Sequence, residues 1–93
     1  MRAARDVAPQ AVAALLRSQP LTAAKVRFAW GAAVGAAMSR ATTVALEADG
    51  TLRVAAAGSH WRRETARSAA VVARRLAELL GPGVVKRIVV KES

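Results

Sequence analysis

The sequence predicts an α+β fold in which the elements follow the order ααββαβ. Apolar residues recur at helical spacing before residue 41 and again over residues 59–80, and they alternate with polar residues over residues 42–56 and 84–91. An Asp-Gly pair at residues 49–50 divides the first alternating stretch and indicates a hairpin. A hairpin followed by a helix and a returning strand gives a three-stranded sheet with helices packed on one face, which leaves the other face open.

Two helices are expected before residue 41. The first covers residues 9–18 and ends at Gln19-Pro20, and its aliphatic residues at helical spacing are Val12, Leu15 and Leu16. The second is capped by Thr22 and runs to about Arg40. Its apolar residues span two adjacent faces, which implies substantial burial. They are Val26, Phe28, Ala29, Trp30, Ala33, Val34 and Ala37.

The centre of the second helix combines a large aromatic residue with two glycines. We interpret Trp30 as a core residue that is surrounded by Val26, Phe28 and Val34. Gly31 and Gly35 each weaken a helix by about 1 kcal/mol relative to alanine. We therefore expect the close approach of another backbone to offset this cost.

The hairpin strands are expected at residues 42–47 and 51–56. Because side chains alternate along a strand, one face of the hairpin would be apolar and buried, and the other would be open. The residues expected on the buried face are Val44, Leu46, Leu52 and Val54. Glu47 and Arg53 would point the other way.

A long helix and a final strand complete the predicted fold. Ser59 is a suitable N-cap, and Gly81-Pro82-Gly83 ends the helix. One apolar stripe of this helix contains Trp61, Thr65, Ala69, Val72, Leu76, Leu79 and Leu80. The strand is expected over residues 84–91, where aliphatic and cationic residues alternate.

The composition indicates a basic protein with a polyanionic partner. The chain has 93 residues, with 15 Lys and Arg against 6 Asp and Glu, for a net charge of +9. So large a charge destabilises the compact state by self-repulsion, which favours an interpretation in which DNA, RNA or a strongly acidic protein surface is bound. The alternative is that frequent Arg and Ala reflect a GC-rich genome.

Several kinds of chemistry are excluded or disfavoured. The chain has no cysteine, so disulfides, thiol chemistry and zinc sites with Cys ligands are excluded. His60 is the single histidine, and the carboxylates are dispersed, so we expect no metal, cofactor or small-molecule substrate. Ser59 and His60 are neighbours at a helix start and point in different directions, with no third group to orient the imidazole. We therefore expect that the protein is not an enzyme.

No membrane or secretion signal is expected. The first apolar stretch is broken by Pro9, Gln10, Arg17 and Pro20, unlike a signal peptide. The longest weakly polar run, residues 28–38, is too short to span a bilayer. We expect a cytoplasmic protein.

Three motifs occur in a characteristic order. Residues 26–35 (VRFAWGAAVG) form a helix with a Trp followed by Val-Gly, residues 49–54 (DGTLRV) form a "dG.L.V" hairpin, and residues 58–64 (GSHWRRE) form an "ssaW..eL" helix start. A Leu-rich helix, a Gly and a terminal strand follow. In this order and spacing the chain resembles the DciA-like family, whose bacterial members are associated with loading the replicative DNA helicase. Thr65 stands where the family usually has an apolar Leu.

This resemblance covers about residues 20–91 of a single domain spanning residues 1–93. It implies a fold similar to the K-homology (KH) domain and a non-enzymatic role as an adaptor that binds the replicative helicase and DNA. The alternative is a small RNA-binding module of the same fold. KH domains clamp a nucleic-acid backbone with a Gly-x-x-Gly loop, and this chain has none, so single-strand recognition in that manner is not expected.

The candidate nucleic-acid-binding residues are basic side chains in two places. On the long helix, the face opposite the apolar stripe carries Arg63, Arg67 and Arg74, flanked by Arg62 and Arg75. On the open face of the sheet they are Arg53, Arg87 and Lys91. Because no aromatic residue interleaves with the arginines, binding would be directed to the phosphate backbone, with little sequence preference. An ordinary solvated face is the alternative for both sets.

The candidate partner-binding residues are Trp61 and the neighbouring His60. Trp61 lies in the first turn of the long helix at the edge of the apolar stripe. We interpret it first as a core residue. The alternative is a partly exposed anchor for a protein partner, since Trp and Arg dominate binding hot spots.

Overall fold

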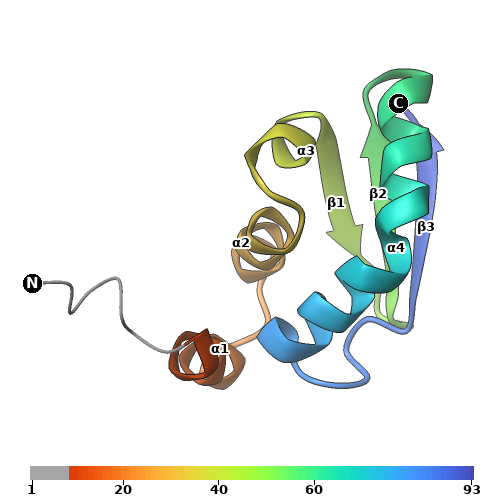
Figure 1. Cartoon of the computed structure of the whole chain (residues 1–93). Coiled ribbons are helices and arrows are strands. Elements are labelled where there is room, and N and C mark those ends of the chain that lie inside the picture. Colours follow the sequence, from red (N-terminus) through yellow and green to blue (C-terminus); the bar gives the residue numbers. More distant parts are fainter. Residues whose placement is uncertain (1–8) are drawn as a thin grey trace, which may run out of the picture.

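The computed structural model describes residues 9–93 and confirms an α+β fold (Figure 1). Its elements are α1 (Pro9–Ser18), α2 (Ala23–Val34), α3 (Ala36–Arg40), β1 (Thr42–Leu46), β2 (Thr51–Ala56), α4 (Gly58–Leu80) and β3 (Arg87–Glu92). The order agrees with the prediction except that the second predicted helix is divided in two. The two termini of the described chain lie on different elements, α1 and β3.

The helix predicted to continue to Arg40 ends instead at Gly35. The backbone of Gly35 has φ 87°, in the left-handed region that favours glycine, and its N–H donates to the carbonyl of Gly31 at 3.0 Å. Gly31 meets a side chain and not the backbone that we expected: a Cβ on Gly31 would lie 3.3 Å from Ser39 Oγ. Gly35 therefore reverses the chain, and α3 folds back over Gly31.

The three strands form one mixed sheet in the order β1-β2-β3. β1 and β2 are antiparallel, with Val44 opposite Val54 and Leu46 opposite Leu52, as the alternation predicted. β3 runs parallel to β2 and is reached through α4, as a parallel connection requires. The predicted start of β3 at Val84 is wrong by three residues, because residues 84–86 belong to a loop in which Lys86 N–H donates to the Gly50 carbonyl at 2.7 Å.

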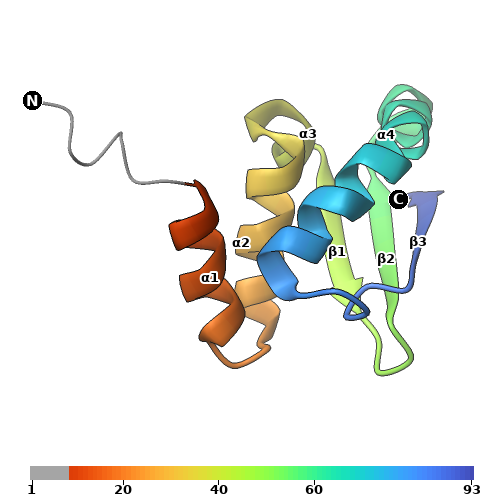
Figure 2. The ribbon, with the colours of Figure 1, turned by 60° about the horizontal axis from the view of Figure 1, so that its bottom comes forward.

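Helices α2 and α4 cover one face of the sheet (Figure 2). The core between them contains Val26, Ala29, Trp30, Ala33, Leu52, Val54, Val72, Leu76 and Leu80. Trp30 is 2% exposed, so its prediction as a core residue is confirmed. Phe28 is 60% exposed, and its prediction as a core neighbour of Trp30 is wrong. Residue 28 is about 200° around the helix from residues 26 and 30, so it points outward when they point inward.

The start of α4 also differs from the prediction. The helix begins at Gly58, the N-cap position is Ala57, and no side chain caps it, so Ser59 is not the N-cap. The apolar stripe is confirmed along most of its length, since Thr65, Val72, Leu76 and Leu80 are buried. On α1, Leu15 is 66% exposed, whereas Leu16 packs against the core. The side chain of Val12 lies outside the described part of the chain.

Two buried threonines differ in their hydrogen bonding. Trp30 Nε1–H donates to Thr42 Oγ1 at 2.8 Å, and that hydroxyl donates to the Met38 carbonyl at 2.7 Å. These two bonds join α2 and α3 to the start of β1. Thr65 is 1% exposed, and its hydroxyl has no hydrogen-bond partner among the described residues. The Thr42 hydroxyl therefore both accepts and donates a hydrogen bond, whereas the Thr65 hydroxyl does neither within the described residues.

Candidate partner and nucleic-acid interfaces

Helix α4 carries its predicted arginine stripe on one exposed face. Residues 63, 67 and 74 lie within about 40° around the helix axis and span about 16 Å along it. Arg67 Nη2 lies 3.2 Å from Glu64 Oε2, but its side chain is 72% exposed. Among residues 9–93, Arg63 and Arg74 form no ion pair. These three arginines can therefore present cations to a phosphate backbone with little competition from local carboxylates.

The two arginines that flank this stripe are held by the fold. Arg62 Nε lies 3.8 Å from Glu92 Oε1 at the end of β3. Arg75 Nη1 donates to the Ala33 carbonyl at 2.8 Å, in the last turn of α2. A cation at this position satisfies a helix-terminal carbonyl and interacts favourably with the helix dipole. Arg75 therefore contributes to the joint between α2 and α4.

The open face of the sheet is less basic than its sequence suggests. Arg53 Nε donates to Glu47 Oε2 across the hairpin. Arg87 Nη1 donates to Thr51 Oγ1 at 2.7 Å and lies 3.6 Å from Asp49 Oδ2. Two of the three predicted cations on this face are thus balanced by carboxylates. Lys91 is exposed and has no ion pair within the described chain.

The turn of the hairpin is fixed by Asp49. Its Oδ1 accepts from the Thr51 backbone N–H at 3.0 Å, as in an Asx turn. The hydrogen bonds from Thr51 lower the pKa of the Asp49 carboxyl, and the charges of Arg87 and Arg53 add to this effect. Asp49 therefore stays ionised and holds Arg87 near the turn.

Sequence reasoning missed the cations that cap helix ends. Lys25 is 7% exposed, and its Nζ donates to the carbonyls of Gln19 at 2.7 Å and Arg17 at 3.4 Å, at the end of α1. Arg17 Nη1 donates to the Glu78 carbonyl, near the end of α4. A lysine beside Val26 on the buried side of α2 is a signal for such a role, because a buried ammonium needs acceptors.

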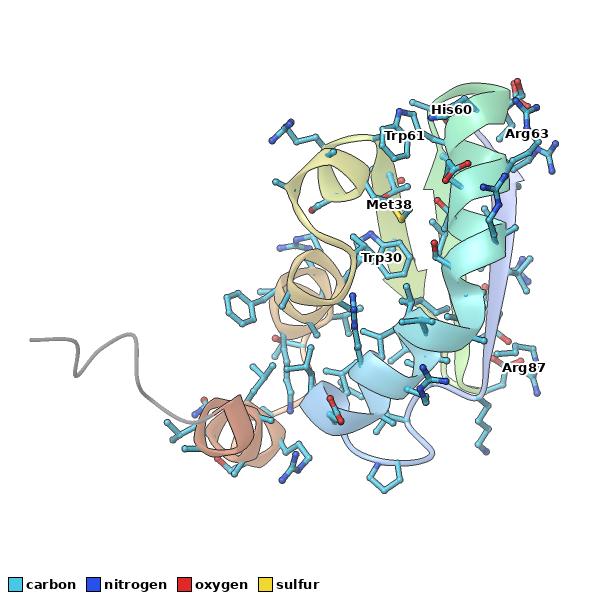
Figure 3. The ribbon with its side chains drawn as sticks, in the orientation of Figure 1. Trp30, Met38, His60, Trp61, Arg63 and Arg87 are labelled. Atoms are coloured by element: carbon cyan, nitrogen blue, oxygen red, sulfur yellow. The ribbon has the colours of Figure 1, made fainter. Side chains whose placement is uncertain are left out.

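Trp61 is half-buried and does not belong to the buried core cluster. Its ring centroid lies 5.2 Å from that of His60, in an edge-to-face arrangement with an interplanar angle of 74°. In Figure 3, Trp61 extends from α4 toward α3, with Met38 and then Trp30 below it, whereas Arg63 points to the other side of α4. The prediction of Trp61 as a core residue is thus only partly met. The ring forms one end of an interhelical surface.

A shallow cavity of about 330 Å³ lies between α2, α3 and α4, and one of its lining residues is Met38, which Figure 3 shows below Trp61. Its floor is apolar, from Ala33, Val34, Met38, Val71 and Val72, and its rim contains Arg67, Ser68 and Arg75. Val71 is 41% exposed. The Trp61 groove, defined as Trp61 together with these lining residues, is therefore an apolar surface with cationic edges.

Other kinds of site are absent from the described chain. Residues 9–93 contain no group of three or more His, Asp or Glu side chains that could hold a metal ion. Within the same residues, no helix is both long enough and apolar enough to cross a bilayer.

Comparison with known proteins identifies a family. A family model described as Dna[CI] antecedent, DciA, matches residues 3–90. The match covers nearly the whole chain and all three sequence motifs, so the resemblance seen in the sequence is confirmed. No curated protein matches the chain.

Proposed function

The chain belongs to the DciA family, and from that premise we propose that it is a non-enzymatic adaptor that binds the replicative DNA helicase and DNA. Membership implies a role of the helicase-loader type in DNA replication. The two binding activities, and the surfaces assigned to them below, are the proposal.

The observation that carries the proposal is the separation of two surfaces on α4. Residues 61 and 63 are about 200° apart around the helix, so Trp61 points away from Arg63 and Arg74 of the stripe. Arg67 lies at the border between the two surfaces, since it also lines the rim of the Trp61 groove. An adaptor must hold two partners at once, and this arrangement lets one helix serve both. The groove offers a half-buried Trp beside an apolar floor, which suits a protein partner.

The arginine stripe suits a phosphate backbone. Three cations spread over about 16 Å with no aromatic side chain among them favour electrostatic binding without base stacking. The sheet residues Arg53 and Arg87 would add less, because Glu47 and Asp49 already neutralise them. We therefore assign DNA first to α4, with Arg62 at the edge and Lys91 as a separate contribution from β3.

The test combines two variants with two partners. Arg63→Glu with Arg74→Glu should weaken duplex DNA binding and reduce the slope of log affinity against log salt by about 2, while helicase binding stays unchanged, because neither residue lines the Trp61 groove. Trp61→Ala should weaken helicase binding and leave duplex DNA binding unchanged. Arg27→Glu, an exposed charge reversal on α2, is the matched control for DNA binding.

Thermal melts of each variant separate lost contacts from lost structure. Trp61→Ala is expected to cost about 2 kcal/mol, since the ring is half-buried, and the fold should survive. The same titrations with RNA of equal length test the RNA-binding alternative, which a preference for RNA would favour. The adaptor proposal fails if the wild-type chain binds neither purified helicase nor DNA.

A further inference from the structure

The outer edge of β1 carries unpaired backbone groups. Odd-numbered residues of this strand pair with β2, as the bonds from Glu47 N–H to the Thr51 carbonyl and from Ala57 N–H to the Ala41 carbonyl show, both at 2.8 Å. In an antiparallel pair, the even-numbered residues between them then direct their N–H and C=O groups away from β2. Within residues 9–93, no hydrogen bond engages the backbone of Val44 or Leu46 on that side. β1 is therefore an edge that could accept another strand.

A cavity of about 680 Å³ lies along the same edge. Its walls come from the start of α2, from β1 and from the loop before β3, and they are mostly aliphatic: Leu21, Ala23, Val26, Val44, Leu46 and Val84. Ala45, Glu47 and Ala48 also line it. Because successive residues of a strand point to opposite faces, a cavity lined by residues 44–48 in sequence opens at the strand's edge and not beneath one face.

These two features together select an extended peptide as the occupant. A helix satisfies its own backbone, whereas an extended segment can bond the free groups of Val44 and Leu46 and place an apolar side chain in the adjacent cavity. A lipid or a small apolar molecule would fill the cavity but leave the strand edge unpaired.

The charge of the elements around this edge indicates the chemistry of the peptide. Residues 9–46, which form α1, α2, α3 and β1, contain four cations and no carboxylate: Arg17, Lys25, Arg27 and Arg40. Lys86 adds a cation at the cavity, and the carboxylate of Glu47, which also lines it, is already paired with Arg53. A second copy of this chain, with the same charge of +9, would be repelled from this edge. An acidic segment would be attracted.

We propose that the outer edge of β1 binds an extended, acidic segment of the replicative helicase as a fourth strand, with one of its aliphatic side chains in the cavity beside Leu46. This inference rests on the proposed function and names the binding mode. β1 follows α3 directly, and Met38 of α3 lines the Trp61 groove, so the strand edge and the groove are formed by consecutive elements of the chain.

The sheet provides a matched pair of substitutions for the test. Val44→Pro removes an outward N–H from β1 and breaks no bond to β2, because proline is tolerated where the N–H faces away from the ladder. Val90→Pro does the same on the opposite edge, since even-numbered residues of β3 also point outward, as the bond from Ser93 N–H to the Ala56 carbonyl at 2.8 Å indicates. Ala23→Trp, at an exposed first residue of α2, blocks the cavity without touching the strand.

Purified helicase is the probe, and binding is measured beside thermal melts. Val44→Pro and Ala23→Trp should each weaken helicase binding at least tenfold, and Val90→Pro should bind like the wild type. Amide hydrogen exchange gives an independent readout. The amides of Val44 and Leu46 should exchange quickly in the free chain and at least tenfold more slowly in the complex. If Val44→Pro does not fold, helicase binding by Ala23→Trp and the exchange rates of the Val44 and Leu46 amides test the inference instead.

The remaining outcomes refute either the strand-edge inference alone or both this inference and the adaptor proposal. Helicase binding that survives both variants, with unprotected Val44 and Leu46 amides, overturns the strand-edge inference and leaves the adaptor proposal intact. A wild-type chain that does not bind helicase overturns both. A wild-type dimer that Val44→Pro dissociates would assign the edge to a second copy of the chain and overturn the inference.

Discussion

Two of the three buried threonines, Thr42 and Thr65, predict opposite effects of the same substitution. Valine keeps the shape of threonine and removes the hydroxyl. At Thr65 that hydroxyl is buried without a partner in the described chain, so the folded state carries an uncompensated desolvation cost. At Thr42 the hydroxyl accepts from Trp30 Nε1 and donates to the Met38 carbonyl. Thr65→Val should therefore stabilise the protein, and Thr42→Val should destabilise it.

The magnitudes follow from the cost of unsatisfied buried groups, about 1–3 kcal/mol each. Thr65→Val should raise the free energy of unfolding by about 1 kcal/mol, because both residues have similar helix propensity and the gain is the hydroxyl's desolvation alone. Thr42→Val should lower it by about 2 kcal/mol, because the Trp30 indole N–H loses its acceptor. For a domain of this size, 1 kcal/mol shifts Tm by about 4–8 °C.

Urea denaturation and thermal melts of the wild type, both variants and the double variant measure these changes. An unchanged m-value would show that stability itself has changed. The double variant should have the sum of the two effects within about 0.5 kcal/mol if the sites are independent. The reasoning is wrong if Thr65→Val lowers Tm, because the hydroxyl would then have a partner such as a buried water or the carbonyl one turn earlier.

Two further predictions concern the turns of the fold. Gly35→Ala should lower the free energy of unfolding by about 1–2 kcal/mol, because φ is 87° at this residue. Gly31→Ala should leave it nearly unchanged, since better helix propensity offsets the contact with Ser39. Equal losses of stability in urea denaturation would contradict this prediction. Folding lowers the pKa of the Asp49 carboxyl below its ordinary value of 3.8. The ionised carboxylate therefore stabilises the fold in full at any pH above 3.8, and this stabilisation is lost as the pH falls through the lower pKa of the folded state. Asp49→Asn should therefore have a shallower loss of Tm than the wild type below about pH 4, and identical acid profiles would count against it.

The hairpin could be predicted from sequence because strand alternation has a period of two. A slip of one residue from the register with Val44 opposite Val54 would move the aliphatic side chains to the open face. The division of α2 from α3 could not be predicted in this way. Gly35 marks a helix end only when the following residues find a place to pack, and the contact of α3 with Gly31 is a tertiary interaction.

The sequence was sufficient to place Phe28 and Trp30 on opposite sides of the helix. An apolar run such as residues 28–30 cannot all face one side of a helix, and the burial of Val26, Ala29, Trp30 and Ala33 leaves residue 28 outside. What sequence could not decide was which side faces the core, because Phe28 and Trp30 are both large and apolar. The hydrogen bond from Trp30 to Thr42 gives the reason that the Trp was selected.

The same limit applies to the arginines, which look equivalent in the sequence and have different roles in the structure. Arg74 and Arg75 are neighbours, yet Arg74 projects outward, whereas Arg75 holds the last turn of α2 through the Ala33 carbonyl. Substitution of Arg75 would weaken DNA binding by loosening the joint between α2 and α4, even if Arg75 never contacts a phosphate. The exposed stripe therefore has to be tested at Arg63 and Arg74, whose substitution leaves helix ends and the Trp61 groove intact. A fall in affinity at unchanged Tm then reports a lost phosphate contact and not a lost fold.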